Sequence, residues 1–147
     1  MPSSATAIAV AEAVAVDLAA MAWGETVDVA RAWVDQVAIA DLATLRVRVF
    51  AQSQTNSRLR RSDDSEEIKV QVVVQKKLAD LTPATIDPLL EKVAAAMKAL
   101  SKPGARLTTL PDAAPYPADW PVLADPAILD QQRTLFSVFI LTFRWPG

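Results

Sequence analysis

The sequence contains no histidine and no cysteine, and it has only three glycines among its 147 residues. A Ser-His-Asp triad, a Cys-His pair and any zinc site with imidazole or thiolate ligands are therefore excluded within one chain. Disulfide bonds are excluded too, so stability must come from packing and from any partner subunits. The glycines, Gly24, Gly104 and Gly147, lie too far apart to form a glycine-rich phosphate loop.

An excess of charge of either sign is also missing. With 15 basic and 17 acidic side chains the net charge is −2, so no overall field attracts DNA or anionic lipid. The first basic residue is Arg31, which leaves the N-terminus without the positive charges of a signal or transit peptide. Glu12 and Asp17 interrupt the alanine-rich N-terminal stretch, which is therefore not a membrane span. These features, with 52% apolar residues, predict a single soluble domain over residues 1–147, made in the cytosol.

Two segments have the periodicity of helices. From Ala5 to Ala22, a high alanine content and an apolar stripe predict a helix that Gly24 ends. Thr82 and Pro83 predict the start of a second helix, with threonine as the cap and proline in the first helical position. Its broad apolar stripe continues to residue 101.

Alternating apolar and polar residues predict five strands, at 27–34, 45–50, 68–75, 106–110 and 134–143. For the first of these, continuation of the preceding helix is the alternative. The last is apolar on both faces, which predicts a central strand or one whose outer face meets another subunit. The fold class predicted is α+β: an antiparallel (mixed) sheet flanked by two main helices, in the order α-β-β-β-α-β-β.

Two connections are unusually long. Residues 51–66 separate the second and third strands and are predicted to form a long polar loop, because hairpin loops usually have about two to five residues. Residues 111–126 hold five of the ten prolines. Since proline lacks an amide donor, this segment is predicted to be a surface excursion without a sheet strand.

The long loop carries three arginines followed by three acids, and a fourth acid comes directly after it. The arginines suit DNA phosphates, but a solvated loop is the common explanation of such charges, and a third is that one subunit's arginines meet the next subunit's acids in a head-to-tail ring. A calcium or magnesium site and an acid–base pair are less favoured, since the spaced ligands and central glycine of a calcium loop are absent. The candidate subunit, partner or DNA-channel contacts are Arg58, Arg60, Arg61, Asp63, Asp64, Glu66 and Glu67.

Three aromatic residues are candidate anchors for a partner, because aromatic side chains are enriched at protein interfaces. They are Tyr116 and Trp120 in the proline-rich excursion and Trp145 near the C-terminus. The alternative is that they cover the domain's own core. No catalytic residue, metal ligand or cofactor-binding motif is identified, so the chain is predicted not to be an enzyme.

The pattern of elements resembles small proteins of tailed-phage and prophage morphogenesis modules. It is carried by the run 45–49 leading into a polar loop with Arg58 and Arg61, by the run 68–77, by the helix start at 86–90 and by the closing strand at 136–144. Over roughly residues 5–144 the chain resembles the tail-terminator, or tail-completion, proteins of long-tailed bacteriophages. The proline-rich segment does not match the common pattern.

The resemblance implies a homo-oligomeric ring, expected to be hexameric, at the head–tail joint of a virion. Such a ring ends polymerisation of the tail tube, offers a surface for head attachment and lets double-stranded DNA pass without sequence recognition. Its implied partners are further copies of itself, the tail tube protein and a head-completion or stopper protein, with synthesis in the host bacterial cytoplasm. The alternatives are a head-completion or stopper protein of the neck, a bacterial adaptor module, or an oxygen-ligand metal hydrolase.

Overall fold

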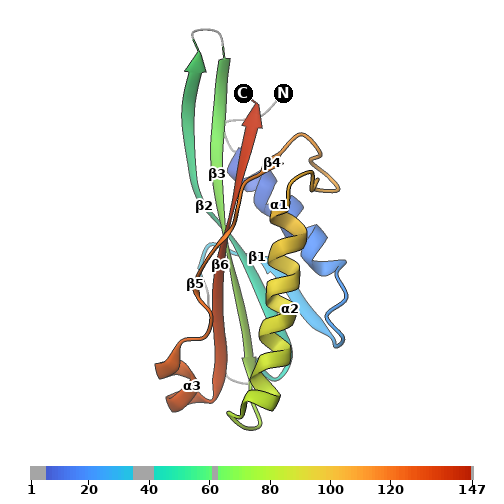
Figure 1. Cartoon of the computed structure of the whole chain (residues 1–147), viewed down its shortest axis with the longest axis vertical. Coiled ribbons are helices and arrows are strands. Elements are labelled where there is room, and N and C mark those ends of the chain that lie inside the picture. The colour runs from blue at the N-terminus through green and yellow to red at the C-terminus, as the bar shows by residue number, and fades with distance from the viewer. Residues whose placement is uncertain (1–5, 35–41, 61–62, 147) are drawn as a thin grey trace.

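The computed structural model describes residues 6–34, 42–60 and 63–146, without the side chains of 56–60, 63–65 and 146. These residues form a mixed α+β fold in which three helices accompany a curled, mixed sheet (Figure 1). The elements follow one another as α1, β1, β2, β3, α2, β4, β5, α3 and β6. The broad class agrees with the sequence analysis, while the predicted order lacks one strand and one helix.

The sheet is built around a long antiparallel hairpin. Its two strands are β2 (Leu45–Arg60) and β3 (Asp63–Lys77), and β6 (Thr134–Pro146) lies antiparallel on the far side of β3. The first strand, β1 (Val27–Arg31), pairs parallel with the first part of β2. A single parallel pair at one edge therefore makes the sheet mixed.

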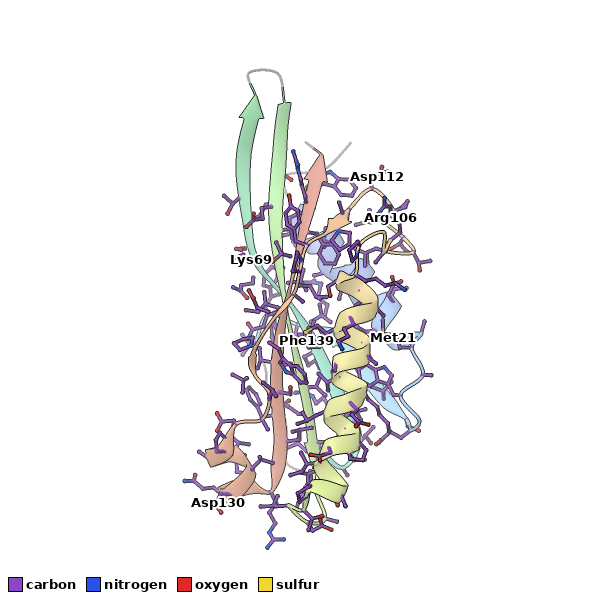
Figure 2. All side chains as sticks on the ribbon, in the orientation of Figure 1. Met21, Lys69, Arg106, Asp112, Asp130 and Phe139 are labelled. Atoms are coloured by element: carbon purple, nitrogen blue, oxygen red, sulfur yellow. The ribbon has the colours of Figure 1, made fainter. Side chains whose placement is uncertain are left out.

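The core lies between the sheet and two helices, α1 (Thr6–Ala19) and α2 (Pro83–Ser101). Alternate residues of β2, β3 and β6 point into it, as expected for a sheet with one face packed on helices. Figure 2 shows Phe139 at the middle of the sheet beside α2. The largest fully buried side chains include Phe139, Phe143, Leu18, Leu45, Ile68 and Leu141.

The prediction that the most apolar run forms a central strand is confirmed. β6 lies between β3 on one side and two short strands on the other. Both of its faces are buried in the middle, because Val138 on one face is 5% exposed and Phe139 on the other is 0% exposed.

The two N-terminal elements are shorter than predicted. α1 ends at Ala19 rather than at residue 22, and the chain turns before Trp23 enters the core with its indole Nε1 donating to the Leu18 carbonyl at 2.8 Å. β1 ends at Arg31, and the exposed Trp33 lies beyond it. Alternation marked the strand correctly but not its end, since valine, alanine and tryptophan suit strand and surface alike.

The start of α2 at Pro83 is confirmed, but the predicted cap is wrong in its chemistry. The side chain of Thr82 makes no capping bond. Instead the carboxylate of Asp80 accepts from the backbone amide of Thr82 at 3.1 Å and from the hydroxyls of Thr82 and Thr85 at 2.6 and 2.7 Å. These hydrogen bonds favour the charged form and lower the pKa of Asp80.

Residues 101–126 depart from the prediction in two places. Residues 106–110 are not a strand. The proline-rich segment instead contains two, β4 (Ala114–Pro115) and β5 (Asp119–Val122), which both pair with β6. Proline is tolerated here because both strands lie at the sheet edge, where a missing amide costs no ladder bond.

The third helix, α3 (Pro126–Gln132), was not predicted. Asp125 caps it by accepting from the amides of Ala127 and Ile128, at 3.0 and 3.2 Å. Arg133 ends it in the left-handed conformation with a φ of 49°. A seven-residue helix spans only about two turns, too short for a clear periodic signal.

Candidate assembly surface

The segment predicted as a long loop, residues 51–66, is instead mostly strand. β2 continues to Arg60 and β3 begins at Asp63, so only residues 61 and 62 separate the two strands. We call the distal part of this hairpin, residues 55–60 and 63–66, the arm. Figure 1 shows the arm extending past the start of α1, away from both long helices. The loop prediction was therefore wrong.

The arm was missed because its strands do not alternate between apolar and polar residues. In the body of the sheet one face is buried under α1 and α2, which requires alternation. The arm has no described helix over either face, so polar residues suit both faces. The antiparallel ladder still pairs the backbones, from Thr55 opposite Glu67 to Arg60 opposite Asp63, with irregularities at Ala51/Ser53 and Arg58/Arg60.

The register of the hairpin places its charges opposite each other. Arg58 pairs with Asp64 and Arg60 with Asp63, while Arg61 lies outside the described residues. Opposite charges at directly opposed positions stabilise a sheet by roughly 0.2–1 kcal/mol relative to alanine pairs. The segregation of charge along the sequence thus has an explanation within one chain, beside the predicted contact between subunits.

The arm joins the body at a polar cluster that the sequence analysis did not identify. The side-chain oxygen of Gln54 accepts from the backbone amide of Ala7, in the first turn of α1, at 2.8 Å. Its amide nitrogen donates to Glu66 Oε1 at 3.2 Å. Glu66 stands opposite Trp145 in the β3–β6 register, and within the described part of the chain Glu66 Oε2 and Trp145 Nε1 are buried without a hydrogen-bond partner. Glu66 therefore belongs to the base of the arm, whereas Glu67 is exposed.

Of the three aromatic candidates, two cover the core and one remains exposed. Trp120 packs on the core and donates from Nε1 to Ser137 Oγ at 2.9 Å. Trp145 also packs on the core. Tyr116 is 38% exposed, with its backbone amide bonded to the Thr142 carbonyl at 2.8 Å.

A more exposed aromatic was missed by the sequence analysis. Trp33 follows β1 and is 61% exposed, with Val34 beside it at 67%. The guanidinium of Arg31 lies 5.2 Å from the centre of the Trp33 ring, within the range of a cation–π contact, and Arg31 Nε also donates to Glu12 Oε1 at 2.6 Å.

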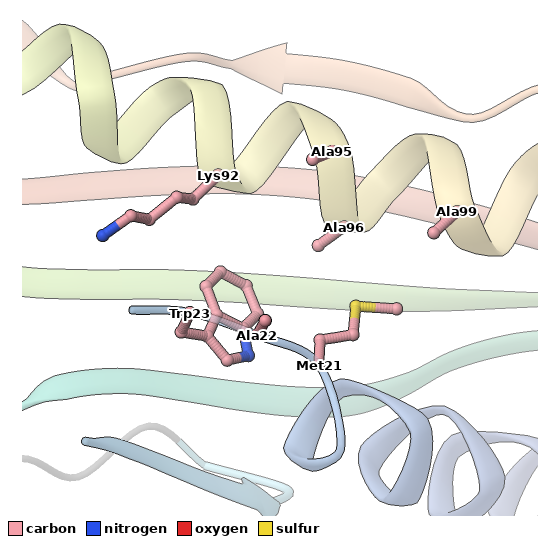
Figure 3. A pocket seen from close by; sticks show the side chains of 7 residues that line it. All are labelled: Met21, Ala22, Trp23, Lys92, Ala95, Ala96 and Ala99. Carbon is pink, nitrogen blue, oxygen red and sulfur yellow. The ribbon is translucent and has the colours of Figure 1, made fainter. Parts of the chain in front are cut away.

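An apolar cavity of about 240 Å³ lies between the end of α1 and the middle of α2 (Figure 3). Alanine side chains from α2 form one wall, and Met21 and Trp23 form the other. Lys92 borders the cavity, with its Nζ 3.8 Å from Glu25 Oε2. The lining offers one cation and no paired acid and base, so its chemistry suits an apolar side chain better than a reaction.

An ion pair links β1 to β2, and a buried hydrogen bond links β2 to β3. Arg48 Nη2 donates to Asp28 Oδ2 at 2.8 Å, which lowers the pKa of the Asp28 carboxyl. Arg46 is 4% exposed and donates from Nη1 to Gln75 Oε1 at 2.8 Å. Across the described ranges, no three or more acidic side chains gather as metal ligands would, and no helix has the length and apolar character needed to span a membrane.

Comparison with known proteins adds no relative. No protein-family model matches this chain, and no curated protein matches it significantly in sequence. The geometry of the arm and the resemblance in the sequence therefore remain the indications of function.

Proposed function

We propose that this protein is a structural virion protein of a long-tailed bacteriophage, a tail terminator that works by assembling with copies of itself. In this proposal a ring, expected to be hexameric, covers the head-proximal end of the tail tube, ends tube polymerisation and offers the surface to which the head attaches. Double-stranded DNA passes through the ring without sequence recognition.

The observation that carries the proposal is the arm. Past the helix-covered core, β2 and β3 continue as a β-ribbon that remains paired from Thr55 opposite Glu67 to Arg60 opposite Asp63. An extended, polar ribbon of this kind suits contact with a neighbouring subunit, where it can lie along another surface and add backbone hydrogen bonds. The exposed Trp33 and Val34 are a second surface suited to a partner, because interfaces are enriched in aromatic residues.

The first test is the assembly state of the purified protein. We expect closed rings in negative-stain electron microscopy and one dominant oligomer in native mass spectrometry. A matched variant replaces residues 58–64 with Asn-Gly, which joins the opposed Ser57 and Ser65 by a two-residue turn. We expect this variant to keep the circular dichroism spectrum of the body and to lose the rings. Monomeric parent protein, or rings in both proteins, would contradict the proposal.

A second test distinguishes the tail terminator from the alternative, a head-completion or stopper protein on the portal side of the joint. The ring should sediment with tails that lack heads if the protein is a terminator. Sedimentation with heads that lack tails would assign it to the stopper class. Binding to neither would favour a bacterial adaptor module.

A further inference from the structure

The arm has an edge along which no described strand lies. β1 covers only the first part of β2, and the last bond on that side runs from the Ala32 amide to the Val49 carbonyl at 2.9 Å. Farther along, between Thr55 and Arg60, β3 occupies one side of β2, and Figure 1 shows no described segment on the other. An edge of this kind is a template for another strand.

The register identifies which backbone groups face this edge. The Val49 carbonyl points toward β1, so the backbone of Arg48 points toward β3, where it is paired with Val73. Alternate residues of β3 therefore bond to β2, and this alternation includes Glu67, the partner of Thr55. The backbone groups of Asn56 and Arg58 must then point away from β3, toward the edge.

The two sides of the sheet differ in their protection against a further strand. The side formed by β4 and β5 carries Pro115 and Pro121, and proline blocks strand addition because it has no amide hydrogen. The edge of the arm contains neither proline nor lysine, and Thr55, Asn56 and Ser57 are uncharged. Among the described strands, the long edge of β2 in the arm thus lacks the proline that protects the opposite side of the sheet.

We infer that the edge of the arm around Thr55, Asn56 and Ser57 pairs antiparallel with the same edge of a second copy, across a two-fold axis. If the axis passes near Thr55 or Ser57, antiparallel pairing places Arg58 and Arg60 opposite uncharged residues of the second copy. Parallel pairing would stack arginine on arginine, which is unfavourable.

A two-fold contact closes at two copies. Because the opposite side of the sheet is protected by proline, the pairing cannot extend into a fibre. Pairing with a second copy would also add a strand to the part of the arm that has the fewest strands. β6 accompanies β3 only to the pair Ser65–Pro146, so beyond it the described arm is a two-stranded ribbon, and such ribbons are marginally stable in water.

The inference does not rest on the proposed function and competes with it for the arm. A cyclic ring uses head-to-tail contacts between subunits, whereas the contact inferred here is isologous, so an arm that makes this contact cannot also make the ring contact. A two-fold dimer without rings would support the inference and leave the virion role unsupported. Rings in which the arms do not meet one another would support the virion role and contradict the inference.

The test uses single cysteines, which are unique because the chain has none of its own. Thr55 and Ser57 bond to β3, so across the new contact each is a non-hydrogen-bonded position, where opposed Cα atoms lie about 4.5 Å apart, close enough for a disulfide. We expect Thr55→Cys or Ser57→Cys to form disulfide-linked dimers at least about tenfold faster than a control, because the contact holds the two thiols together. The control is Asp130→Cys, in an exposed helix that Figure 2 shows at the opposite end of the molecule.

A second variant tests the backbone bonds directly. Asn56→Pro removes one amide from the edge and leaves the ladder to β3 intact, with Asn56→Ala as the matched control. We expect proline to abolish the dimer in native mass spectrometry across a dilution series and alanine to preserve it, with unchanged circular dichroism in both. The inference would be overturned if both cysteine variants crosslinked as slowly as Asp130→Cys. It would also be overturned if the dimer survived in Asn56→Pro.

Discussion

The body of the sheet and the arm are made of the same two strands, yet different forces hold them. In the body, Val47, Val49, Val70 and Val72 are fully buried under α1 and α2. In the arm the ladder continues with polar residues and opposed charges. Burial thus supplies most of the stability of the body, while cross-strand pairing supplies that of the arm. Backbone hydrogen bonds run through both parts, so the burial of side chains, and not the ladder, distinguishes the part of the sheet that stabilises the fold from the part suited to a partner.

The largest expected effect comes from removing the centre of the body. Phe139→Ala deletes a fully buried ring from the central strand and should lower the free energy of unfolding by about 3–5 kcal/mol. Thr55→Ala in the arm should change it by no more than about 0.5 kcal/mol. Urea unfolding followed by circular dichroism measures both. Equal losses in the two variants would remove the distinction between body and arm.

A smaller effect is expected where the proline-rich segment meets the body. Trp120→Phe keeps most of the packing but removes the hydrogen bond to Ser137, whose hydroxyl also donates to the Val122 carbonyl at 3.2 Å. The free energy of unfolding should fall by about 1 kcal/mol. Tyr116→Phe, at an exposed position of the same segment, should leave it nearly unchanged. A large loss for Tyr116→Phe would show that this ring also supports the core.

Charge exchange in the arm separates pairing within one chain from contact with another. Arg58→Glu places two acids opposite each other and should cost about 0.5 kcal/mol. Adding Asp64→Arg restores the opposite pair with its polarity reversed. If the charges act within the hairpin, the double variant should recover both stability and assembly. Recovered stability with assembly still lost would show that the arginine contacts a second subunit.

The smallest effect is expected at the ion pair between β1 and β2. Arg48 lowers the pKa of Asp28, so the ionised carboxylate stabilises the fold above its ordinary pKa of 3.8, and this contribution is lost as the pH falls through the lowered value. The Asp28 side chain is 55% exposed, so solvent screening limits the contribution to a few tenths of a kcal/mol. At neutral pH Asp28→Asn should be slightly less stable than the parent, and the difference should vanish in acid. A difference that persists at low pH would assign the loss to packing.

The sequence predicted best where one face of an element is buried. The α2 pattern located its start at Pro83, and the alternation at 45–50 and 68–75 found the part of the hairpin that lies in the body of the sheet. The arm failed the same test, because residues with no described helix over them need not alternate. Short elements failed for a different reason. β4, β5 and α3 are set by contacts with β6 and by the cap at Asp125, and no periodic signal reveals such contacts.

The candidate surface was predicted in position but not in form. The charges between Arg58 and Glu67 were singled out correctly as a group, but they were assigned to a loop, and the register that opposes Arg58 and Asp64 could not be foreseen. The role of Gln54, which links α1 to Glu66, could not be predicted from the sequence, since one polar residue within a polar run does not stand out. The exposure of Trp33 depends on where β1 ends, which the sequence did not specify.

By itself, the sequence determined the broad α+β class, the presence of α1 and α2 and the side chains that the chain lacks, because composition and periodicity follow directly from the residues. Tertiary structure alone decided that a polar segment becomes a strand, that its charged residues are opposed in the register, and that no described strand covers the edge of the arm while the opposite side of the sheet carries proline. The physical reason is that backbone pairing is satisfied by any residue except proline. Its pattern therefore depends on which strands lie side by side, and side-chain chemistry alone does not encode that arrangement.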